Sequence, residues 1–206
     1  MIEVQTTSRL TPPSRMIVSQ YKCIFIHTPK CAGESIETVL AGKPYNRSGF
    51  RGHPEKHWGV HEISHKYPEE FIQYYKFSIV RNPWDRVVSW VKYRDMRYQR
   101  AEGTFEGRMQ SDLCDKVFLN FMLEHSFSSM LFMGNRLAVD SVIRFENLED
   151  EFPKICNYLG VRNKGLPHVN STKHRHYSSY YTNSSRERVA ELFCQDIQYF
   201  NYSFET

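Results

Sequence analysis

The sequence lacks any apolar run approaching the ~20 residues needed to cross a bilayer. The opening stretch, MIEVQTTSRLTPPSRM, also lacks the apolar segment of a secretion signal. We therefore expect a cytoplasmic protein with no membrane span. Cysteines are few, five in all, odd in number and without a CxxC pair, so neither a disulfide framework nor a zinc site is indicated.

A strong excess of one charge is also missing. The 27 basic and 23 acidic residues give a net charge of +4, too small to indicate a nucleic-acid partner, although it suits an anionic ligand. With 206 residues and 40% hydrophobic content, the chain can bury one sizeable core. We expect a flexible lead-in over residues 1–21 and a single domain over residues 22–206.

One junction between a strand and a helix has the features of an anion-binding loop. The strand-like stretch CIFIH at residues 23–27 is followed directly by TPKCAGES, and a helical pattern covers residues 33–40. The first amides of a helix are unpaired and carry the positive end of its dipole, Gly33 allows close approach, and Lys30 adds a charge. The Gly-Lys-Ser/Thr of a Walker A loop is absent. The predicted cradle comprises Pro29, Lys30, Cys31, Ala32, Gly33, Glu34 and Ser35.

A second junction of the same kind lies further along the chain. Residues 77–81, FSIVR, are followed by NPWDRVVSW, with Asn82 as the expected N-cap and Pro83 at the first helical position. Arg81 then stands at the end of a strand, and Ser89 lies about two turns into the helix. We predict that Arg81 and Ser89 bind one phosphate from two sides.

Both junctions resemble motifs of the sulfotransferases that use 3'-phosphoadenosine 5'-phosphosulfate (PAPS). IFIHTPKCAGESIETVL resembles their 5'-phosphosulfate loop, and FSIVRNPWDRVVSWVKYR resembles their 3'-phosphate motif. Segments 142–148, 166–171 and 196–202 are similar to the carbohydrate-type branch, so the resemblance covers about residues 22–204. It implies a P-loop NTPase-like α/β fold, a three-layer sandwich with a central parallel sheet. It also implies PAPS as co-substrate, no metal, and a contact between Lys173 and the 3'-phosphate.

The expected chemistry is transfer of a sulfuryl group to an acceptor hydroxyl or amine. Lys30 is expected to stabilise charge on the leaving phosphate oxygen. A general base must face the acceptor, and histidine suits neutral pH. HWGVHEI resembles the family's H-x-x-x-x-E-I stretch, so we rank His57 first, His61 second and His53 third. Glu34 is the other candidate base, since it replaces a frequent threonine or serine, and its simpler role is to complement the helix dipole.

Four histidines at every fourth position, His53, His57, His61 and His65, raise a metal alternative, since i and i+4 imidazoles on one helical face can chelate zinc. Gly52 and Pro54 argue against a continuous helix there. Two rival functions also stay open: a P-loop kinase or NTPase, and a catalytically inactive protein that binds PAPS or its product, adenosine 3',5'-bisphosphate. The acceptor is expected to be a carbohydrate or a small molecule; aromatic content of 15% could line its site, although core packing explains most of these residues.

Hydrophobic periodicity places the remaining elements. A long loop is expected over residues 42–58 and a mobile connector over residues 101–111. Apolar spacing in the helix over residues 112–124 predicts a core-facing stripe of Leu113, Val117, Phe118, Phe121 and Met122. Strands are expected at residues 76–81 and 141–145, and further helices at residues 60–75, 83–100, 148–159 and 185–200.

Overall fold

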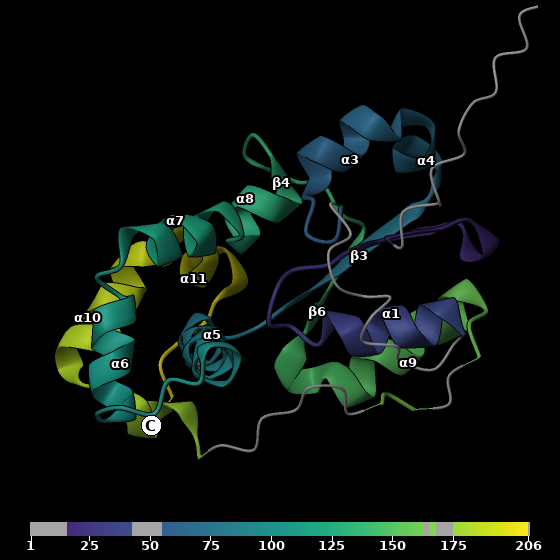
Figure 1. The fold of residues 1–206 in the computed structure, drawn as a ribbon. Coiled ribbons are helices and arrows are strands. Elements are labelled where there is room, and N and C mark those ends of the chain that lie inside the picture. The colour runs from purple at the N-terminus through teal and green to yellow at the C-terminus, as the bar shows by residue number, and fades with distance from the viewer. Residues whose placement is uncertain (1–15, 43–54, 163–164, 168–174, 206) are drawn as a thin grey trace, which may run out of the picture.

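The computed structural model, which describes residues 16–42, 55–162, 165–167 and 175–205, is built around a four-stranded sheet (Figure 1). The strand order is β1-β2-β3-β6. Strands β2 (Cys23–Ile26), β3 (Tyr75–Val80) and β6 (Ser141–Arg144) are parallel, and β1 (Ile17–Val18) pairs antiparallel with β2. β1 and the short 3-10 helix η1 (Ser19–Tyr21) lie in the segment where we expected a lead-in, because Met16 and Ile17 are buried in the core.

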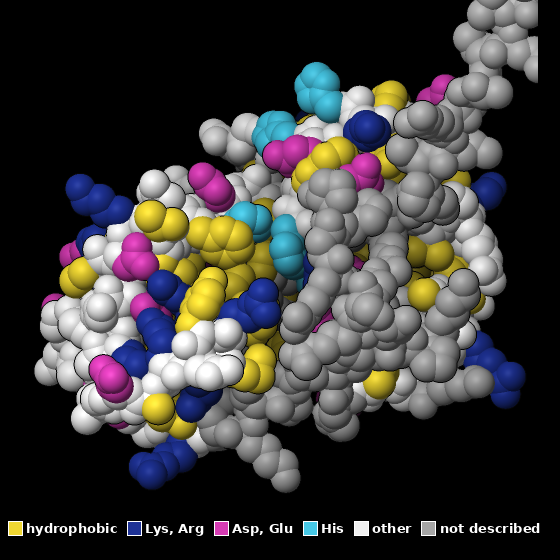
Figure 2. All heavy atoms as spheres, viewed as in Figure 1, with side chains coloured by type: hydrophobic (Ala, Val, Ile, Leu, Met, Phe, Trp, Pro, Cys, Tyr) yellow, Lys and Arg dark blue, Asp and Glu magenta, His cyan; other side chains and the backbone are white. Residues whose placement is uncertain are grey.

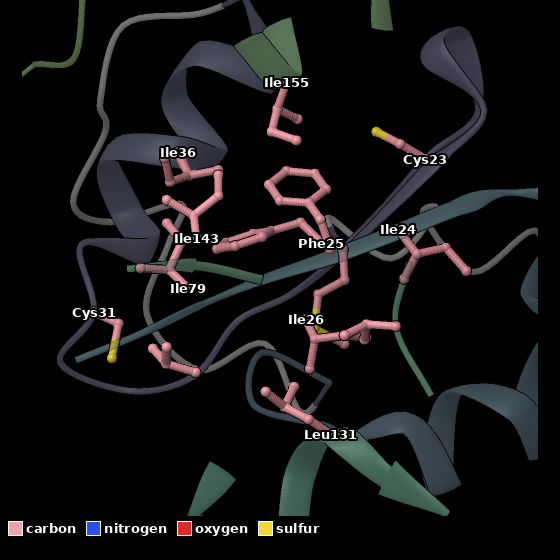
Figure 3. Close-up of a cluster of buried hydrophobic side chains, with 14 of the residues drawn as sticks. Cys23, Ile24, Phe25, Ile26, Cys31, Ile36, Ile79, Leu131, Ile143 and Ile155 are labelled. Carbon is pink, nitrogen blue, oxygen red and sulfur yellow. The ribbon is translucent and has the colours of Figure 1, made fainter. Parts of the chain in front are cut away.

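The parallel strands are covered on both faces, which is why β2 is apolar at every position. Helices α1 (Gly33–Ala41) and α9 (Leu148–Leu159) lie together on one side of the sheet, and α3 (Val60–Lys66) and α4 (Pro68–Gln73) lie on the other (Figure 1). Phe25 lies within the cluster of buried side chains around the sheet (Figure 3). Its ring centroid is 5.1 Å from that of Phe77 on β3. The predicted α/β fold with a central, mostly parallel sheet is confirmed.

A second hydrophobic cluster lies in a group of helices beyond the ends of the strands (Figure 1). Its long helix, α5 (Pro83–Tyr98), begins as predicted: the Asn82 side chain accepts a hydrogen bond from the Trp84 amide at 3.1 Å. The remaining members are α6 (Phe105–Asp112), α7 (Lys116–Glu124), the 3-10 helix η3 (Tyr177–Tyr180), α10 (Asn183–Leu192) and α11 (Cys194–Phe200).

Two predicted helices are each divided in the structure. The helix expected over residues 60–75 breaks at Tyr67, because Pro68 has no amide hydrogen and starts α4 instead. The helix expected over residues 185–200 starts earlier, at Asn183 behind a Thr182 cap, and breaks at Phe193 between α10 and α11. α9 ends at Gly160 as expected, with a φ of 69° that suits glycine.

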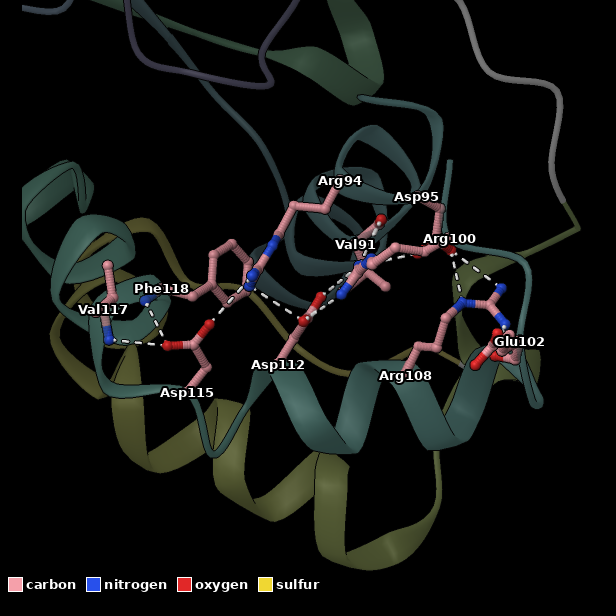
Figure 4. A network of polar contacts seen from close by, with 10 residues as sticks. All are labelled: Val91, Arg94, Asp95, Arg100, Glu102, Arg108, Asp112, Asp115, Val117 and Phe118. Carbon is pink, nitrogen blue, oxygen red and sulfur yellow. Dashed lines mark hydrogen bonds and ion pairs between the residues drawn. The ribbon is translucent and has the colours of Figure 1, made fainter. Parts of the chain in front are cut away.

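The connector predicted over residues 101–111 is wrong, because most of it forms α6. Thr104 caps this helix by accepting a hydrogen bond from the Gly107 amide at 3.1 Å. A charged network then fastens α6 to α5 (Figure 4). Arg100 bonds Asp112 at 2.7 Å and Asp95 at 2.8 Å. The other pairs join Arg94 to Asp112 and Asp115, and Arg108 to Asp95.

The helix predicted over residues 112–124 starts later, as α7, with the Asp115 side chain capping it through the Val117 amide at 3.0 Å. Its predicted core stripe is correct except at Val117, which is 80% exposed. Sequence patterns missed α8 (Phe127–Leu131) and the small hairpin of β4 (Phe132–Met133) and β5 (Arg136–Leu137). After β6 the 3-10 helix η2 (Phe145–Asn147) leads into α9. Within the described residues, no helix is long and apolar enough to span a bilayer.

Candidate active site

The loop between β2 and α1 presents a row of backbone amides that bond to none of the residues the structure describes. Lys30 and Ala32 both have positive φ, 67° and 59°, with Cys31 between them. Alternation of this kind turns successive N–H groups toward one concave side, which is a nest for an anion. The N–H groups of Lys30, Cys31, Ala32 and Gly33 donate no hydrogen bond to another described residue. The backbone of this loop has a geometry that suits an anion, and the binding of a ligand by the predicted cradle stays a prediction.

Two arginines hold the loop from its other side. Arg86 Nε donates to the Pro29 carbonyl at 3.0 Å, and Arg81 Nη1 donates to the Lys30 carbonyl at 3.0 Å. Because the peptide bond is planar and trans, the amides of Lys30 and Cys31 point away from these arginines. The carbonyls are satisfied by α5 and its entry, and the amides are left for a ligand. Sequence analysis missed Arg86, whose role depends on the docking of α5 against the loop.

Arg81 and Ser89 lie where the second junction predicted them, at the end of β3 and within α5, and both are buried. In the structure Arg81 also bonds Asp85, with Nε and Nη2 each 2.8 Å from Oδ2, and its guanidinium lies 4.2 Å from the Phe145 ring centroid. The Ser89 hydroxyl makes no hydrogen bond to another described residue. Their joint contact with a phosphate stays a prediction; Lys173 and His53 fall outside the described residues.

The Lys30 side chain leaves the loop toward α5. Its Nζ lies 4.4 Å from the ring centroid of Tyr93 and 5.8 Å from that of Trp90. Burial, and then the nearby positive charge of Arg81, lower the pKa of Lys30 to about 8. Lys30 is therefore mostly charged at pH 7, and it loses its proton as the pH rises through about 8.

This lowered pKa predicts a pH dependence of anion binding. Lys30 carries its charge below pH 8 and loses it above, so affinity for adenosine 3',5'-bisphosphate should fall as the pH rises through about 8. The decline should reach up to about tenfold per pH unit, because one proton is linked to binding. Calorimetric titrations from pH 7 to 9.5 would measure it, since the phosphates, with a second pKa near 6, are already ionised there. A Lys30→Met variant showing the same decline would contradict the assignment to Lys30.

His57 lies in the turn before α3, not on that helix, and is half-buried. Its Nδ1 lies 3.0 Å from the His27 carbonyl oxygen, which can only accept, so Nδ1 carries the hydrogen and Nε2 keeps its lone pair. Burial, and then the neighbouring His27, lower the pKa of His57 to about 2. His57 is thus a neutral imidazole with a free proton-accepting nitrogen.

The other histidines of the four-residue pattern do not join His57. α3 begins at Val60, behind an extended Gly59, so no helix runs through His57 to His61. His61 and His65 are exposed on α3. The one-face arrangement behind the metal alternative is therefore wrong for the described histidines, and no group of three or more His, Cys, Asp or Glu residues in the described ranges could hold a metal ion.

A buried pair that sequence analysis missed lies behind the loop. His27 follows β2, and its Nδ1 is 2.5 Å from Oε1 of Glu37 on α1, with side chains only 4% exposed in each case. The His27 ring also meets the His57 ring edge-on, with centroids 4.7 Å apart. His57 in turn meets the His125 ring edge-on at 5.9 Å. Three imidazoles far apart in the sequence thus lie in a row that starts at His27, beside Gly33 of the nest.

Residues 14–203 match the model of the sulfotransferase family. The chain belongs to this family. Among solved structures, the chain is similar to the sulfotransferase from Alicyclobacillus acidocaldarius, with 16% identity over 89% of this chain and 86% of that one, and a TM-score of 0.36. At that score the likeness adds no argument about the site. No curated protein matches the sequence.

Glu34 and Cys31, two residues of this sulfotransferase's loop, each contact another residue through their side chains. The Glu34 carboxylate lies 2.7 Å from Lys56 Nζ and stands in the first turn of α1, which matches its simpler, dipole-complementing role. Cys31 is buried and its Sγ donates to the Pro29 carbonyl at 3.5 Å. Burial raises the pKa of the Cys31 thiol, so it stays protonated at neutral pH. Neither side chain is placed as a free base.

The structure gives a second reason for glycine at position 33, besides the close approach of a ligand that we expected. A Cβ at this position would lie 2.0 Å from Nε2 of His27. The space beside Gly33 is therefore filled by the buried imidazole of the sulfotransferase itself, which is fixed by Glu37. Glycine is needed here for packing as well as for access to the loop.

We predict that Gly33→Ala destabilises the protein by about 2–4 kcal/mol, because the methyl group displaces His27 from a buried, charge-assisted hydrogen bond. Chemical denaturation would measure the change. The matched control is Gly107→Ala in α6, where the new Cβ would lie 3.3 Å from Oγ1 of Thr104 and needs a shift of only a few tenths of an ångström, so a change within about 1 kcal/mol is expected. Equal stability of Gly33→Ala and wild type would contradict the packing role.

Proposed function

We propose that this sulfotransferase transfers the sulfuryl group of PAPS to a hydroxyl or amine of a saccharide or small molecule. The observation that carries the proposal is the nest of unpaired amides from Lys30 to Gly33 with the Lys30 ammonium beside it. Amides in this arrangement bind phosphate and sulfate oxygens without a metal. Arg81 and Ser89 are proposed to bind the 3'-phosphate, as the second motif predicts, with Lys173 beside them.

In the proposed reaction the acceptor oxygen forms a bond to sulfur while the bond between sulfur and the bridging phosphate oxygen breaks. The electron pair of the broken bond stays on that phosphate oxygen, where Lys30 and the amides stabilise the charge. The acceptor proton passes to Nε2 of His57, the atom left free by the hydrogen bond to His27. The products are the sulfated acceptor and adenosine 3',5'-bisphosphate.

His57 is favoured over the other candidate bases by its surroundings. His61 is exposed on α3. Glu34 is paired with Lys56 at 2.7 Å, so abstraction of a proton by its carboxylate would weaken an ion pair. Only His57, among these three, combines partial burial, a fixed tautomer and a position next to the loop.

Calorimetric titration with adenosine 3',5'-bisphosphate tests the donor directly. We expect it to bind at least about 100-fold more tightly than AMP, because the 3'-phosphate gains charge-assisted hydrogen bonds of about 1.5–3 kcal/mol each. Ser89→Ala and Arg81→Ala should reduce this preference, and Arg188→Ala, on the exposed face of α10, should keep it. Tighter binding of ATP with magnesium, or no preference for the 3'-phosphate, would return the protein to the kinase and NTPase class.

A further inference from the structure

A continuous row of rings leads away from His57, and we name it the aromatic wall: Tyr93 and Trp90 of α5, Phe121 of α7, and His125. Tyr93 and Trp90 have centroids 6.1 Å apart, and Trp90 and Phe121 are 5.1 Å apart. Phe121 and His125 are stacked at 4.2 Å and 29°. His125 then meets His57 edge-on at 5.9 Å.

The aromatic wall ends next to Lys30 on one side and next to His57 on the other, the two residues to which we assign the chemistry. Lys30 Nζ lies 4.4 Å from the Tyr93 centroid and 5.8 Å from the Trp90 centroid. At the other end, His57 adjoins His125. The aromatic wall therefore runs from the cation proposed to stabilise the leaving oxygen toward the imidazole proposed to take the proton.

The aromatic wall reaches the surface. Tyr93 is 37% exposed, and its hydroxyl makes no hydrogen bond to another described residue. Phe121 and His125 are half-buried, and Trp90 forms the buried support behind them. Figure 2 shows histidine side chains at the edge of a hydrophobic patch in the middle of this face, with Lys and Arg side chains around it. Tyr93, Phe121 and His125 therefore keep part of their surface open.

The polar groups of the wall can accept hydrogen bonds from a hydroxyl. His125 Nδ1 lies 2.8 Å from the Phe121 carbonyl, as His57 Nδ1 lies 3.0 Å from the His27 carbonyl. Both rings donate through Nδ1, so the neutral form of each ring carries its lone pair on Nε2. In the described part of the chain, no carboxylate forms a hydrogen bond or ion pair with a wall residue. The aromatic wall and the neighbouring His57 together offer ring faces and two imidazole nitrogens that accept hydrogen bonds in the neutral form.

We propose that the acceptor is a phenol, whose ring stacks on Phe121 and Tyr93 and whose hydroxyl donates to Nε2 of His57. This inference rests on the sulfotransferase function proposed above and narrows its acceptor. The phenolic oxygen bonds to sulfur, the phosphate oxygen beside Lys30 leaves with the electron pair, and the phenolic proton passes to His57.

The acidity of the acceptor supports a phenol over a sugar. A phenolic hydroxyl, with a pKa of about 10 as in tyrosine, gives up its proton far more readily than the hydroxyl of a sugar. A phenol therefore needs less assistance from the neutral imidazole of His57 than a sugar does.

The acceptor test uses 2-naphthol, its saturated analogue decahydro-2-naphthol, and a disaccharide, each with PAPS and the full-length protein. Mass spectrometry of the sulfated products gives kcat/KM for each. We expect 2-naphthol to exceed both others by about 100-fold or more, because only it combines a stacking ring with an acidic hydroxyl. Equal or faster sulfation of the disaccharide or the saturated analogue overturns the inference.

Two variants test the aromatic wall itself. Tyr93→Leu and Phe121→Leu should each raise KM for 2-naphthol about five- to tenfold, the loss of one ring contact. Phe121→Leu should leave the Kd of the bisphosphate unchanged, whereas Tyr93→Leu also removes a contact of the Lys30 ammonium. The matched control is Tyr98→Leu, at the end of the same helix α5, where the side chain is 67% exposed. An unchanged KM in both wall variants overturns the inference.

A fluorescence titration of 2-naphthol, with and without the bisphosphate, separates failure of this inference from failure of the proposed function. If the bisphosphate does not bind, the proposed function fails, and naphthol binding that is weakened in the two wall variants still supports the wall. If the bisphosphate binds but 2-naphthol neither binds nor is sulfated, the phenol inference is overturned and the sulfotransferase function stands.

Discussion

Substitution of His57 by alanine is expected to lower kcat by about 100- to 10,000-fold, the usual contribution of a positioned general base. The reason is the fixed tautomer: the His27 carbonyl takes the Nδ1 hydrogen at 3.0 Å, so Nε2 is ready to accept a proton. Steady-state assays with PAPS would measure kcat, and calorimetry should find the bisphosphate Kd unchanged within about twofold, because His57 belongs to the acceptor side.

The matched control is His61→Ala. His61 is exposed on α3, four residues from His57, and its loss should leave kcat unchanged. A second readout is the pH profile: since the pKa of His57 is lowered to about 2, kcat/KM should show no limb from His57 between pH 5 and 7. Full activity of His57→Ala would move the base to Glu34, and Glu34→Gln would then be the variant to measure.

Replacement of Lys30 by methionine is expected to lower kcat by about 100- to 1,000-fold, the usual loss when one charge-stabilising donor is removed from an active site. Methionine keeps the length and the apolar contact with Tyr93 and Trp90, so the variant removes mainly the charge. Binding of the bisphosphate should weaken as well, because in the proposed site Lys30 contacts the phosphate in the ground state as well as in the transition state.

Lys92→Met is the matched control for Lys30→Met. Lys92 is also a lysine above two rings, 4.5 Å from the Phe105 centroid and 4.6 Å from the Tyr180 centroid, but it lies on α5 away from the nest. Its loss should leave kcat unchanged. If both variants lose activity to the same degree together with melting temperature, the effect of Lys30 is structural and the proposed role is wrong.

The two junctions could be predicted well because their signals are local. The caps, the proline at the first helical position and the switch from a strand pattern to a helical pattern all lie within a few residues of Lys30 and of Arg81. The structure accordingly starts α1 at Gly33 and α5 at Pro83. Helix α6 was missed, and a connector was predicted over residues 101–111 instead, because α6 depends on ion pairs between Arg100, Asp95 and Asp112.

The support behind the loop could not be predicted from the sequence. His27 and Glu37 are ten residues apart and come together only when α1 folds back along β2. Arg86 reaches both the Pro29 and the His125 carbonyls, the latter at 2.5 Å, because α5, the loop and α7 converge beyond the strand ends. His27 and Arg86 both lie within the sequence motifs. The partners of Arg86 are backbone carbonyls, however, and every residue type has a backbone carbonyl, so the sequence could not indicate these contacts.

The sequence by itself determined the family and the α/β class of this protein, through two strand-to-helix junctions in a fixed order, since local propensity is written in neighbouring residues. The phosphate contacts of Lys30, Arg81 and Ser89 stay a prediction. Tertiary structure alone decided which histidine adjoins the loop, why Gly33 must be glycine, and how rings from α5 and α7 form one wall. Those features are contacts between elements distant in the chain, and they depend on how the sheet and helices pack.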